Sequence, residues 1–335
     1  MRIARALACA AVLTAGILPA ASAAQAPPSD GQVIVHDPTV IRQGSTWYVF
    51  NTIGKYIGIR TSPDLKTWNN AGAVFAEIPA WARDAVPGVD GIWAPDISYV
   101  DGEYRLYYSI STFGSNRSAI GLATSPTLDQ QAENYGWTDR GMVVMSTPDD
   151  DFNAIDPDFI VDAQGRHWLS LGSFWSGIKL FPLDPATGKP PQGTQPTAIA
   201  RRPAPAGGPA PVEAPTILQR DGAYYLIASY DYCCKGVNST YYTVIGRADT
   251  ITGPYRGKDG SEMMQGGGTI LIRADLQEKQ RYRGPGHADT FTDTDGATTI
   301  VWHAYDRQAD GAPVLRVAPL QWQGDGWPVV ISTDQ

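Results

Sequence analysis

Short apolar segments and polar turns alternate along this chain in a unit that returns about every sixty residues. Each unit has a turn-forming start, an apolar strand, a short turn and a second strand rich in aromatic residues. In the first unit the apolar strand follows Asp37-Pro38, the turn is Gln43-Gly44, and the aromatic strand covers residues 47–50. Glycine-containing turns between β-rich runs are typical of hairpins. Since no stretch shows sustained helical periodicity, the pattern predicts an all-β protein.

The unit occurs five times, and its starting position can be followed through every copy. The corresponding residues are Pro38, Pro95, Pro157, Pro215 and His287, at separations of 57, 62, 58 and 72 residues. Four short strands in about sixty residues make one propeller blade, so the repeats predict a five-bladed β-propeller. A two-sheet sandwich is the alternative, but it does not explain the regular return of the same unit.

The N-terminus has the pattern of an export signal. Arg2 and Arg5 precede an apolar run over residues 6–18, and residues 21–23 form a small-residue cleavage pattern. The run is shorter than the about 20 apolar residues of a membrane span; a retained N-terminal anchor is the alternative. We therefore expect a signal peptide over residues 1–23, cleavage near Ala23, and one secreted catalytic propeller over residues 24–335, in the periplasm or the medium.

Charge and aromatic content narrow the class of partner. The formal net charge is −8 and no Lys/Arg block is present, which argues against nucleic acid and anionic membranes as partners. Ten Trp and sixteen Tyr are a high aromatic content, and aromatic faces pack against sugar rings, although most large rings belong to the core. The composition favours a neutral polysaccharide partner, and we expect a monomer.

Only two cysteines remain after removal of the signal peptide. They are adjacent, Cys233 and Cys234, and their spacing excludes a Cys-rich zinc site. They can form a vicinal disulfide in the oxidising exterior or remain two free thiols.

Carboxylates stand at the start of three units. In a propeller the first strand of each blade lines the central channel, so residues at matching positions converge in space. Asp37 and Asp156 directly precede the proline, and Glu213 lies one position earlier relative to Pro215. Alone, each Asp-Pro is an ordinary turn and Glu213 a solvated charge. Together they surround one channel mouth, and a glycosidic bond must be flanked by two carboxyl groups to be hydrolysed.

These motifs resemble those of family 43 glycoside hydrolases and, within them, the endo-α-1,5-L-arabinanases. The similarity extends from about residue 33 to the C-terminus. It is carried by the segments VHDPT (35–39), GIWAPD (91–96), NAIDPD (153–158), GSFWSG (172–177), VEAP (212–215) and RGPGH (283–287). The resemblance implies hydrolysis of internal α-1,5-L-arabinofuranosidic bonds in arabinan, a side chain of pectin.

The resemblance also implies a role for each carboxylate. Asp37 would be the general base, Glu213 the general acid, and Asp156 the residue that raises the pKa of Glu213 and orients it. A general acid must be protonated near neutral pH, and a nearby carboxylate favours that form. Asp37 would activate water for a single displacement with inversion, with the acid and base carboxyl groups roughly 6.5–9.5 Å apart.

Other site residues follow from the same resemblance. It implies a metal ion, usually calcium, with His287 as the main protein ligand and water as the rest, although calcium normally takes oxygen ligands and a lone His is more often structural. The aromatic floor of the cleft would be formed by Trp93 and Phe113. The candidate sugar hydrogen-bonders are Asn153, Ser173 and Ser176, and the residues expected in the core or at the rim are Trp175, Trp302 and His303.

Other functions compete with this interpretation. An exo-acting arabinofuranosidase or arabinanase, or a β-xylosidase, would use the same scaffold, but such enzymes often carry an added β-sandwich domain or a blocking loop, and we expect no room for another domain here. Five-bladed fructosyl-processing enzymes also use three acids, but their Trp-rich first-blade motif is not found. A non-catalytic sugar-binding propeller predicts the loss of at least one acid, and all three are present.

Overall fold

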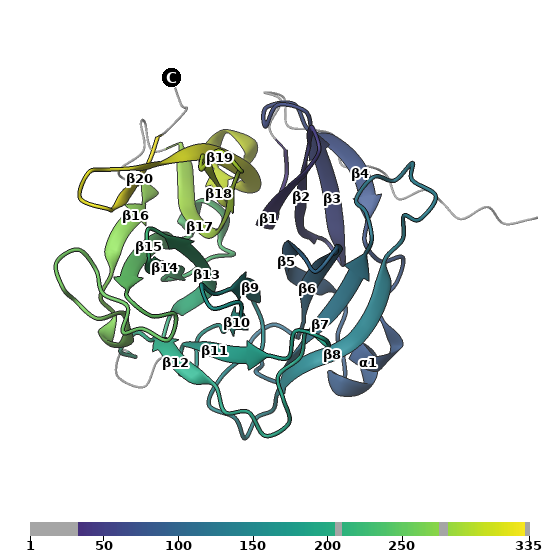
Figure 1. Ribbon diagram of the computed structural model, residues 1–335, viewed down its shortest axis with the longest axis horizontal. Helices are drawn as coiled ribbons and strands as arrows, with labels where there is room; N and C mark the ends of the chain where they lie inside the picture. The colour runs from purple at the N-terminus through teal and green to yellow at the C-terminus, as the bar shows by residue number, and fades with distance from the viewer. Residues whose placement is uncertain (1–32, 205–209, 275–280, 332–335) are drawn as a thin grey trace, which may run out of the picture.

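The computed structural model describes residues 33–204, 210–274 and 281–331, and within them the chain forms five four-stranded antiparallel sheets around a common axis (Figure 1). The strand order in each sheet follows the chain from the centre outward. The predicted five-bladed β-propeller is confirmed. The predicted signal peptide, residues 1–23, lies outside the described residues. None of the described helices is long and apolar enough to span a membrane.

Each blade consists of four consecutive strands, and short helices lie in the connections. The strands of the first three blades are β1 (His36–Gln43), β2 (Thr46–Ile53), β3 (Tyr56–Ser62), β4 (Asn69–Ala73), β5 (Ile92–Val100), β6 (Glu103–Ile110), β7 (Ser118–Ser125), β8 (Thr138–Ser146), β9 (Asp158–Val161), β10 (His167–Leu171), β11 (Ile178–Leu183) and β12 (Thr197–Ala200). Those of the last two are β13 (Val212–Arg220), β14 (Ala223–Tyr230), β15 (Tyr242–Ala248), β16 (Thr269–Ile272), β17 (Tyr282–Thr292), β18 (Thr298–Asp306), β19 (Ala312–Trp322) and β20 (Pro328–Val330). The helices are α1 (Ala80–Ala85) and the 3₁₀ turns η1 (Gly236–Asn238), η2 (Met263–Gln265) and η5 (Arg307–Ala309).

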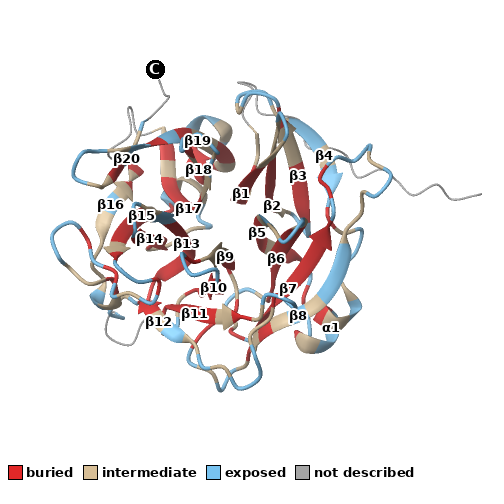
Figure 2. Cartoon of the chain, in the orientation of Figure 1, coloured by how far each residue is buried: buried red, intermediate tan, exposed pale blue. Residues whose placement is uncertain are grey.

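Apolar side chains fill the space between neighbouring blades. Each of the five described hydrophobic clusters joins two adjacent blades, including one between the last blade and the first. Figure 2 shows the buried residues along the inner strands, whereas β4 is largely exposed. Burial of both faces of each sheet holds the inner strands at fixed positions around the axis.

The first described residues close the ring on the last blade. Ile34 pairs antiparallel with Val314 of β19, the Val35 N–H donates to the Pro313 carbonyl at 3.1 Å, and the Leu315 N–H donates to the Val33 carbonyl at 2.9 Å. The chain then continues directly into β1. Residues at the start of β1 are thereby fixed against the fifth blade.

A backbone distortion recurs where each inner strand begins. The five residues with φ between 36° and 57° at this point are Asp37, Ala94, Asp156, Ala214 and His287. Positive φ is uncommon for non-glycine residues, and in four of the five blades the pairing register also shifts here. Such β-bulges redirect side chains and often lie beside active sites.

Polar groups hold these bulges in place. Four of the five backbone N–H groups donate to a side chain on the second strand of the neighbouring blade. The pairs are Ala94 with Thr52 (2.8 Å), Asp156 with Ser109 (3.0 Å), His287 with Ser229 (2.8 Å) and Asp37 with His303 (3.2 Å). The fifth, from Ala214, donates to Asp156 Oδ2 at 3.2 Å. The ring of bulges is therefore a hydrogen-bonded unit.

Candidate active site

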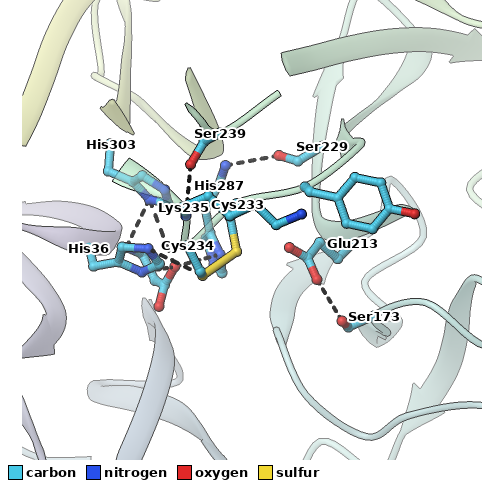
Figure 3. The surroundings of a disulfide bond; sticks show 12 residues. His36, Ser173, Glu213, Ser229, Cys233, Cys234, Lys235, Ser239, His287 and His303 are labelled. Atoms are coloured by element: carbon cyan, nitrogen blue, oxygen red, sulfur yellow. Dashed lines mark hydrogen bonds and ion pairs between the residues drawn. A yellow bond between two sulfur atoms is a disulfide. The ribbon is translucent and has the colours of Figure 1, made fainter. Parts of the chain in front are cut away.

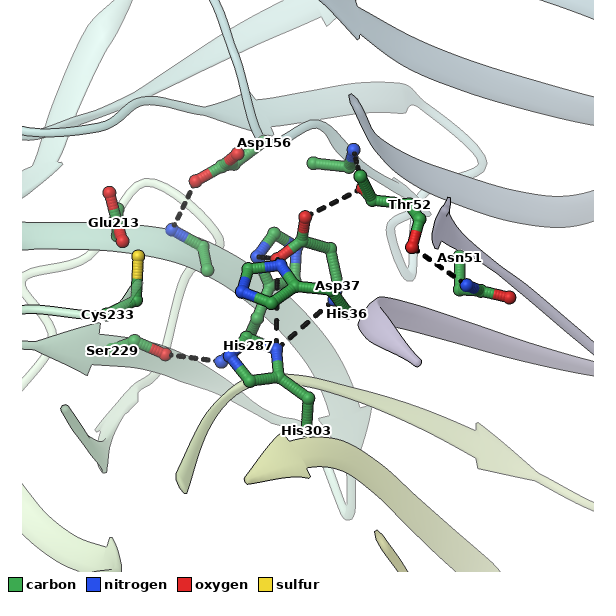
Figure 4. A network of polar contacts seen from close by, with 12 residues as sticks. His36, Asp37, Asn51, Thr52, Asp156, Glu213, Ser229, Cys233, His287 and His303 are labelled. Carbon is green, nitrogen blue, oxygen red and sulfur yellow. Dashed lines mark hydrogen bonds and ion pairs between the residues drawn. The ribbon is translucent and has the colours of Figure 1, made fainter. Parts of the chain in front are cut away.

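The three predicted catalytic carboxylates lie together at the start of three inner strands (Figure 4). Asp37 belongs to β1, Asp156 lies two residues before β9, and Glu213 belongs to β13. All three side chains are buried, and Asp156 is close enough for the charges of Glu213 and Asp37 to raise its pKa. The repeat thus brings together residues that are far apart in sequence.

Histidines and a threonine surround the Asp37 carboxylate. Oδ1 lies 2.7 Å from His36 Nδ1, 3.0 Å from His287 Nδ1 and 3.8 Å from His303 Nδ1, and Oδ2 accepts the Thr52 hydroxyl at 2.7 Å. Burial would raise the pKa of Asp37, but the electrostatic attraction of His36 and His287 and their hydrogen bonds hold it well below its usual value. Asp37 is therefore ionised at neutral pH.

The other two histidines beside Asp37 differ in charge. Burial opposes the protonation of His287, but the charge and hydrogen bond of Asp37, with the charges of Asp156 and Glu213, raise its pKa to about 9. Burial, and then the electrostatic interaction with His36, hold the pKa of His303 well below its usual value. His287 is thus cationic at neutral pH, while neutral His303 accepts the backbone N–H of Asp37 on Nδ1.

The environment of Glu213 favours the protonated carboxyl group, in contrast to that of Asp37. Burial raises its pKa, with a contribution from the negative charge of Asp37, against hydrogen bonds from Ser173 and Tyr241 and the charge of His287. The Ser173 hydroxyl donates to Oε2 at 2.6 Å. Burial also raises the pKa of Asp156 well above its usual value. Two neighbouring buried carboxyl groups cannot both ionise easily, so this pair retains a proton more readily than Asp37 does.

Comparison with known proteins identifies the family. The sequence matches Glycosyl hydrolases family 43 over residues 31–328. This chain belongs to that family. It is 44% identical over 299 residues to the extracellular endo-α-(1→5)-L-arabinanase 1 of Bacillus subtilis, and the match covers 88% of this chain and 87% of the relative. It is 42% identical over 307 residues to the extracellular exo-α-(1→5)-L-arabinofuranosidase ArbA of Cellvibrio japonicus, over 89% and 87% of the two chains.

A solved structure gives the same result for the fold. The α-L-arabinanase of Cellvibrio cellulosa in complex with arabinohexaose matches with a TM-score of 0.84 at 42% identity, over 90% of this chain and 96% of that one. The family 43 protein described here is therefore a glycoside hydrolase, and the predicted family and enzyme class are confirmed.

The histidine predicted to bind calcium contacts the predicted general base. His287 Nδ1 contacts Asp37 Oδ1, and no group of three or more His, Cys, Asp or Glu ligand atoms in the described residues includes His287. Calcium takes six to eight oxygen ligands, so the protein residues at this position fit the ion poorly. The calcium site stays a prediction.

The predicted substrate contacts have different surroundings. Phe113 is 87% exposed on the loop after β6, and Trp93 is half-buried on β5 directly before Ala94. Asn153 is buried in the segment before Asp156. The Ser176 N–H donates to the Asp151 carbonyl at 2.9 Å. Their contacts with substrate stay predictions.

Four further predicted positions can be placed. Ser173 contacts the predicted general acid, and this contact indicates that it orients Glu213. Trp302 is buried in the core, whereas Trp175 is 37% exposed at the rim. His303 is fully buried, as expected for a core residue, but it also contacts Asp37.

The sequence did not reveal the partners of the catalytic carboxylates. His36, adjacent to Asp37, also contacts Tyr305, whose hydroxyl lies 2.9 Å from His36 Nε2. His303 stacks on His36 with ring centroids 3.9 Å apart. His303 occupies the same place in its blade as Thr52 in the first, so an alignment of the second strands could have identified it. No comparable signal marks Tyr305.

Cys233 and Cys234 are joined by a disulfide in the loop after β14 (Figure 3). Of the two states that the sequence left open, the structure has the vicinal bridge. It lies near His36 and Glu213.

Proposed function

We propose that this family 43 enzyme is a secreted endo-arabinanase that cleaves internal α-1,5-L-arabinofuranosidic bonds with inversion. One observation carries the proposal: two carboxyl groups of the same site have pKa values shifted in opposite directions, Asp37 downward and Glu213 upward. Such a separation is typical of acid and base assignments. The relatives' names support arabinan as the substrate and an extracellular location.

The proposed mechanism is a single displacement. Ionised Asp37 accepts a proton from a water molecule as the water oxygen attacks the anomeric carbon. Protonated Glu213 donates its proton to the leaving glycosidic oxygen, so the bond breaks and Glu213 becomes ionised. Asp156, beside Glu213, belongs to the buried pair that retains a proton, and its Oδ2 accepts the N–H of Ala214, which holds the neighbouring acid in place. The carboxyl separation of roughly 6.5–9.5 Å required for inversion stays a prediction.

An exo-acting enzyme is the second candidate, because one relative of 42% identity carries an exo name. The two modes differ in where the chain is cut and not in the carboxylates that cut it. The same scaffold therefore supports either, and only the product pattern separates them.

Product analysis on linear α-1,5-arabinan tests the proposal. We expect rapid loss of viscosity and a spread of short oligosaccharides of inverted anomeric configuration, absent in Glu213→Gln. Release of arabinose or one short product with slow viscosity loss would assign the exo mode. Retained configuration would contradict the mechanism, and no turnover by the folded protein on arabinan or xylan would favour a sugar-binding propeller.

Removal of metal tests the predicted calcium ion at His287. If calcium supports the site, chelation will lower activity or melting temperature, and added calcium will restore it. Because His287 also contacts Asp37, His287→Ala alone is not informative; the chelated wild-type enzyme is the sample to compare. Unchanged activity and melting temperature after chelation, with metal analysis showing no calcium, would exclude the ion.

A further inference from the structure

A chain of polar contacts connects the disulfide to the predicted base. Figure 3 shows the disulfide beside His36. The Cys234 backbone N–H donates to the Tyr305 hydroxyl at 2.7 Å, and Cys234 Sγ lies 3.9 Å from His36 Nε2. Tyr305 Oη is 2.9 Å from His36 Nε2, and His36 Nδ1 is 2.7 Å from Asp37 Oδ1. Three contacts therefore connect an exposed loop of the fourth blade to the catalytic carboxylate of the first.

The donors around Tyr305 determine which atom donates the proton in the Tyr305–His36 and His36–Asp37 contacts. Its oxygen accepts the Cys234 N–H and interacts with the Ser239 hydroxyl. Burial raises the pKa of Tyr305, so the phenol remains protonated. With its oxygen occupied as an acceptor, its single O–H is directed at His36 Nε2. An Nε2 that accepts requires the imidazole proton on Nδ1, where it donates to Asp37 Oδ1.

The covalent link explains why the Cys234 N–H can hold this position. Cys234 has a φ of 66°, uncommon for a residue with a side chain, and it is exposed. A bond between adjacent side chains restricts rotation of the intervening backbone. Without it, the loop would be free to turn the N–H away, and Tyr305 could then accept a proton from His36 Nε2, leaving a lone pair on Nδ1 facing the carboxylate.

We propose that the Cys233–Cys234 disulfide is a positioning element for catalysis, which holds the Cys234 N–H on Tyr305 and thereby fixes the His36 tautomer that donates to Asp37. This inference rests on the proposed role of Asp37 as the base. It makes the enzyme dependent on the oxidised pair, although neither sulfur takes part in the chemistry.

Kinetics of the wild-type enzyme test the proposal without a mutation at the cysteines. Oxidised, reduced and reoxidised protein are compared on linear arabinan, with alkylation of thiols to verify each state. We expect reduction to lower kcat roughly ten-fold or more, the effect of losing one hydrogen bond to a charged group, with little change in KM, and reoxidation to restore it. A rise in KM alone would assign the disulfide to substrate binding, and unchanged kinetics would exclude any role; both overturn the proposal.

Tyr305→Phe separates positioning from general stabilisation. This variant removes the O–H that connects the loop to His36, so we expect a similar loss of kcat and no further loss on reduction. Coupled residues show such non-additivity, whereas independent effects add. Ser111→Ala, which removes a buried hydroxyl that contacts Ser118 on the second blade, is the control and should respond to reduction as the wild type does. If the losses of kcat from Tyr305→Phe and from reduction add, the proposed chain of hydrogen bonds from Cys234 to Asp37 is contradicted.

Nitrogen NMR of the histidine side chains gives a readout that does not depend on activity. The chain has four histidines, and His36→Gln identifies the signal of His36. We expect the Nδ1–H form in the oxidised protein and a mixture of tautomers after reduction. An Nε2–H form, or the same spectrum in both states, would overturn the proposal. If the oxidised wild type fails to hydrolyse arabinan, the proposed function fails. The NMR comparison still tests whether the disulfide fixes the His36 tautomer.

Discussion

Asp37 and Glu213 show how two carboxyl groups in one buried site acquire opposite protonation states. Burial raises the pKa of both, and the sign of the nearest charges decides the outcome. Asp37 is in contact with the imidazoles of His36 and His287, of which His287 is cationic, whereas Glu213 has the hydroxyls of Ser173 and Tyr241 and the negative charge of Asp37. The neighbours of each carboxyl group, and not the residue type, therefore favour the proposed roles of Asp37 as base and Glu213 as acid.

The alkaline limb of the pH profile should report Glu213. Because a general acid must carry its proton, kcat should fall as the pH rises through the raised pKa of Glu213. Glu213→Gln should lower kcat by about 100-fold or more, the usual contribution of general acid catalysis. In Ser173→Ala the limb should move to higher pH, since the Ser173 hydroxyl lowers the pKa of Glu213. The same limb in Ser173→Ala and wild type would show that another group limits the reaction.

The three carboxylates could be predicted because they stand at, or one residue before, the same position of a repeat, but their partners could not. His36 and Tyr305 are 269 positions apart, and Asp37 and His303 are 266 apart, so their contacts exist only after the last blade meets the first. Ser173 has a hydroxyl that suits a sugar equally well, and only the fold directs it to Glu213. The charge states also depend on burial, which residue type alone does not specify.

The inner strands carry the site because each begins with the same bulge. The five blades and the order of their strands were predictable from the spacing of turns and apolar runs, whereas the positive φ values were not, because two of the five positions are Ala, which does not signal this conformation. In the fifth blade Gly286 precedes the bulge, and a Cβ there would lie 2.1 Å from Cδ1 of the buried ring of Tyr241. The glycine thus lets β17 approach the ring that contacts Glu213.

Gly286→Ala should therefore reduce both stability and activity. Overpacking of a buried site costs about 1–3 kcal/mol, and displacement of Tyr241 would disturb its hydrogen bond with Glu213. We expect a melting temperature lower by several degrees and a reduced kcat. Gly136→Ala is the control, since its Cβ would meet nothing within 4 Å and no positive φ is required. Equal melting temperatures for the two variants would show that Tyr241 moves aside freely.

The ring of blades encloses a second layer of acidic side chains, each two residues after a bulge in sequence. Asp96, Asp158 and Asp289 come from three different blades, and they have carboxylate oxygens within 4.8 Å of one another. Asp158 Oδ2 accepts the Ser170 hydroxyl and the Ile217 N–H, both at 2.9 Å. They line a cavity of about 370 Å³. Closure of five blades places these groups together, and the catalytic carboxylates are not part of this layer.

This layer should make stability depend on pH. Burial and the charge of Asp289 raise the pKa of Asp158 to about 8, and burial raises that of Asp289 to about 6. Above the ordinary Asp pKa of 3.8 the unfolded chain releases these protons, whereas the folded protein still holds them. The stability that the bound protons contribute is therefore lost as the pH rises from about 4 to 8.

Asp158→Asn should flatten this decline, because its amide keeps the hydrogen bonds without a titrating proton. The measurement is the free energy of unfolding in urea at several pH values between 4 and 8. Each proton held accounts for a slope of about 1.4 kcal/mol per pH unit. Asp64→Asn is the control, because N–H groups of Thr67 and Lys66 lower the pKa of this exposed carboxyl group, so its titration lies below that range. Equal slopes in wild type and Asp158→Asn would mean that Asp158 is ionised in the folded protein and that its charge is balanced within the ring.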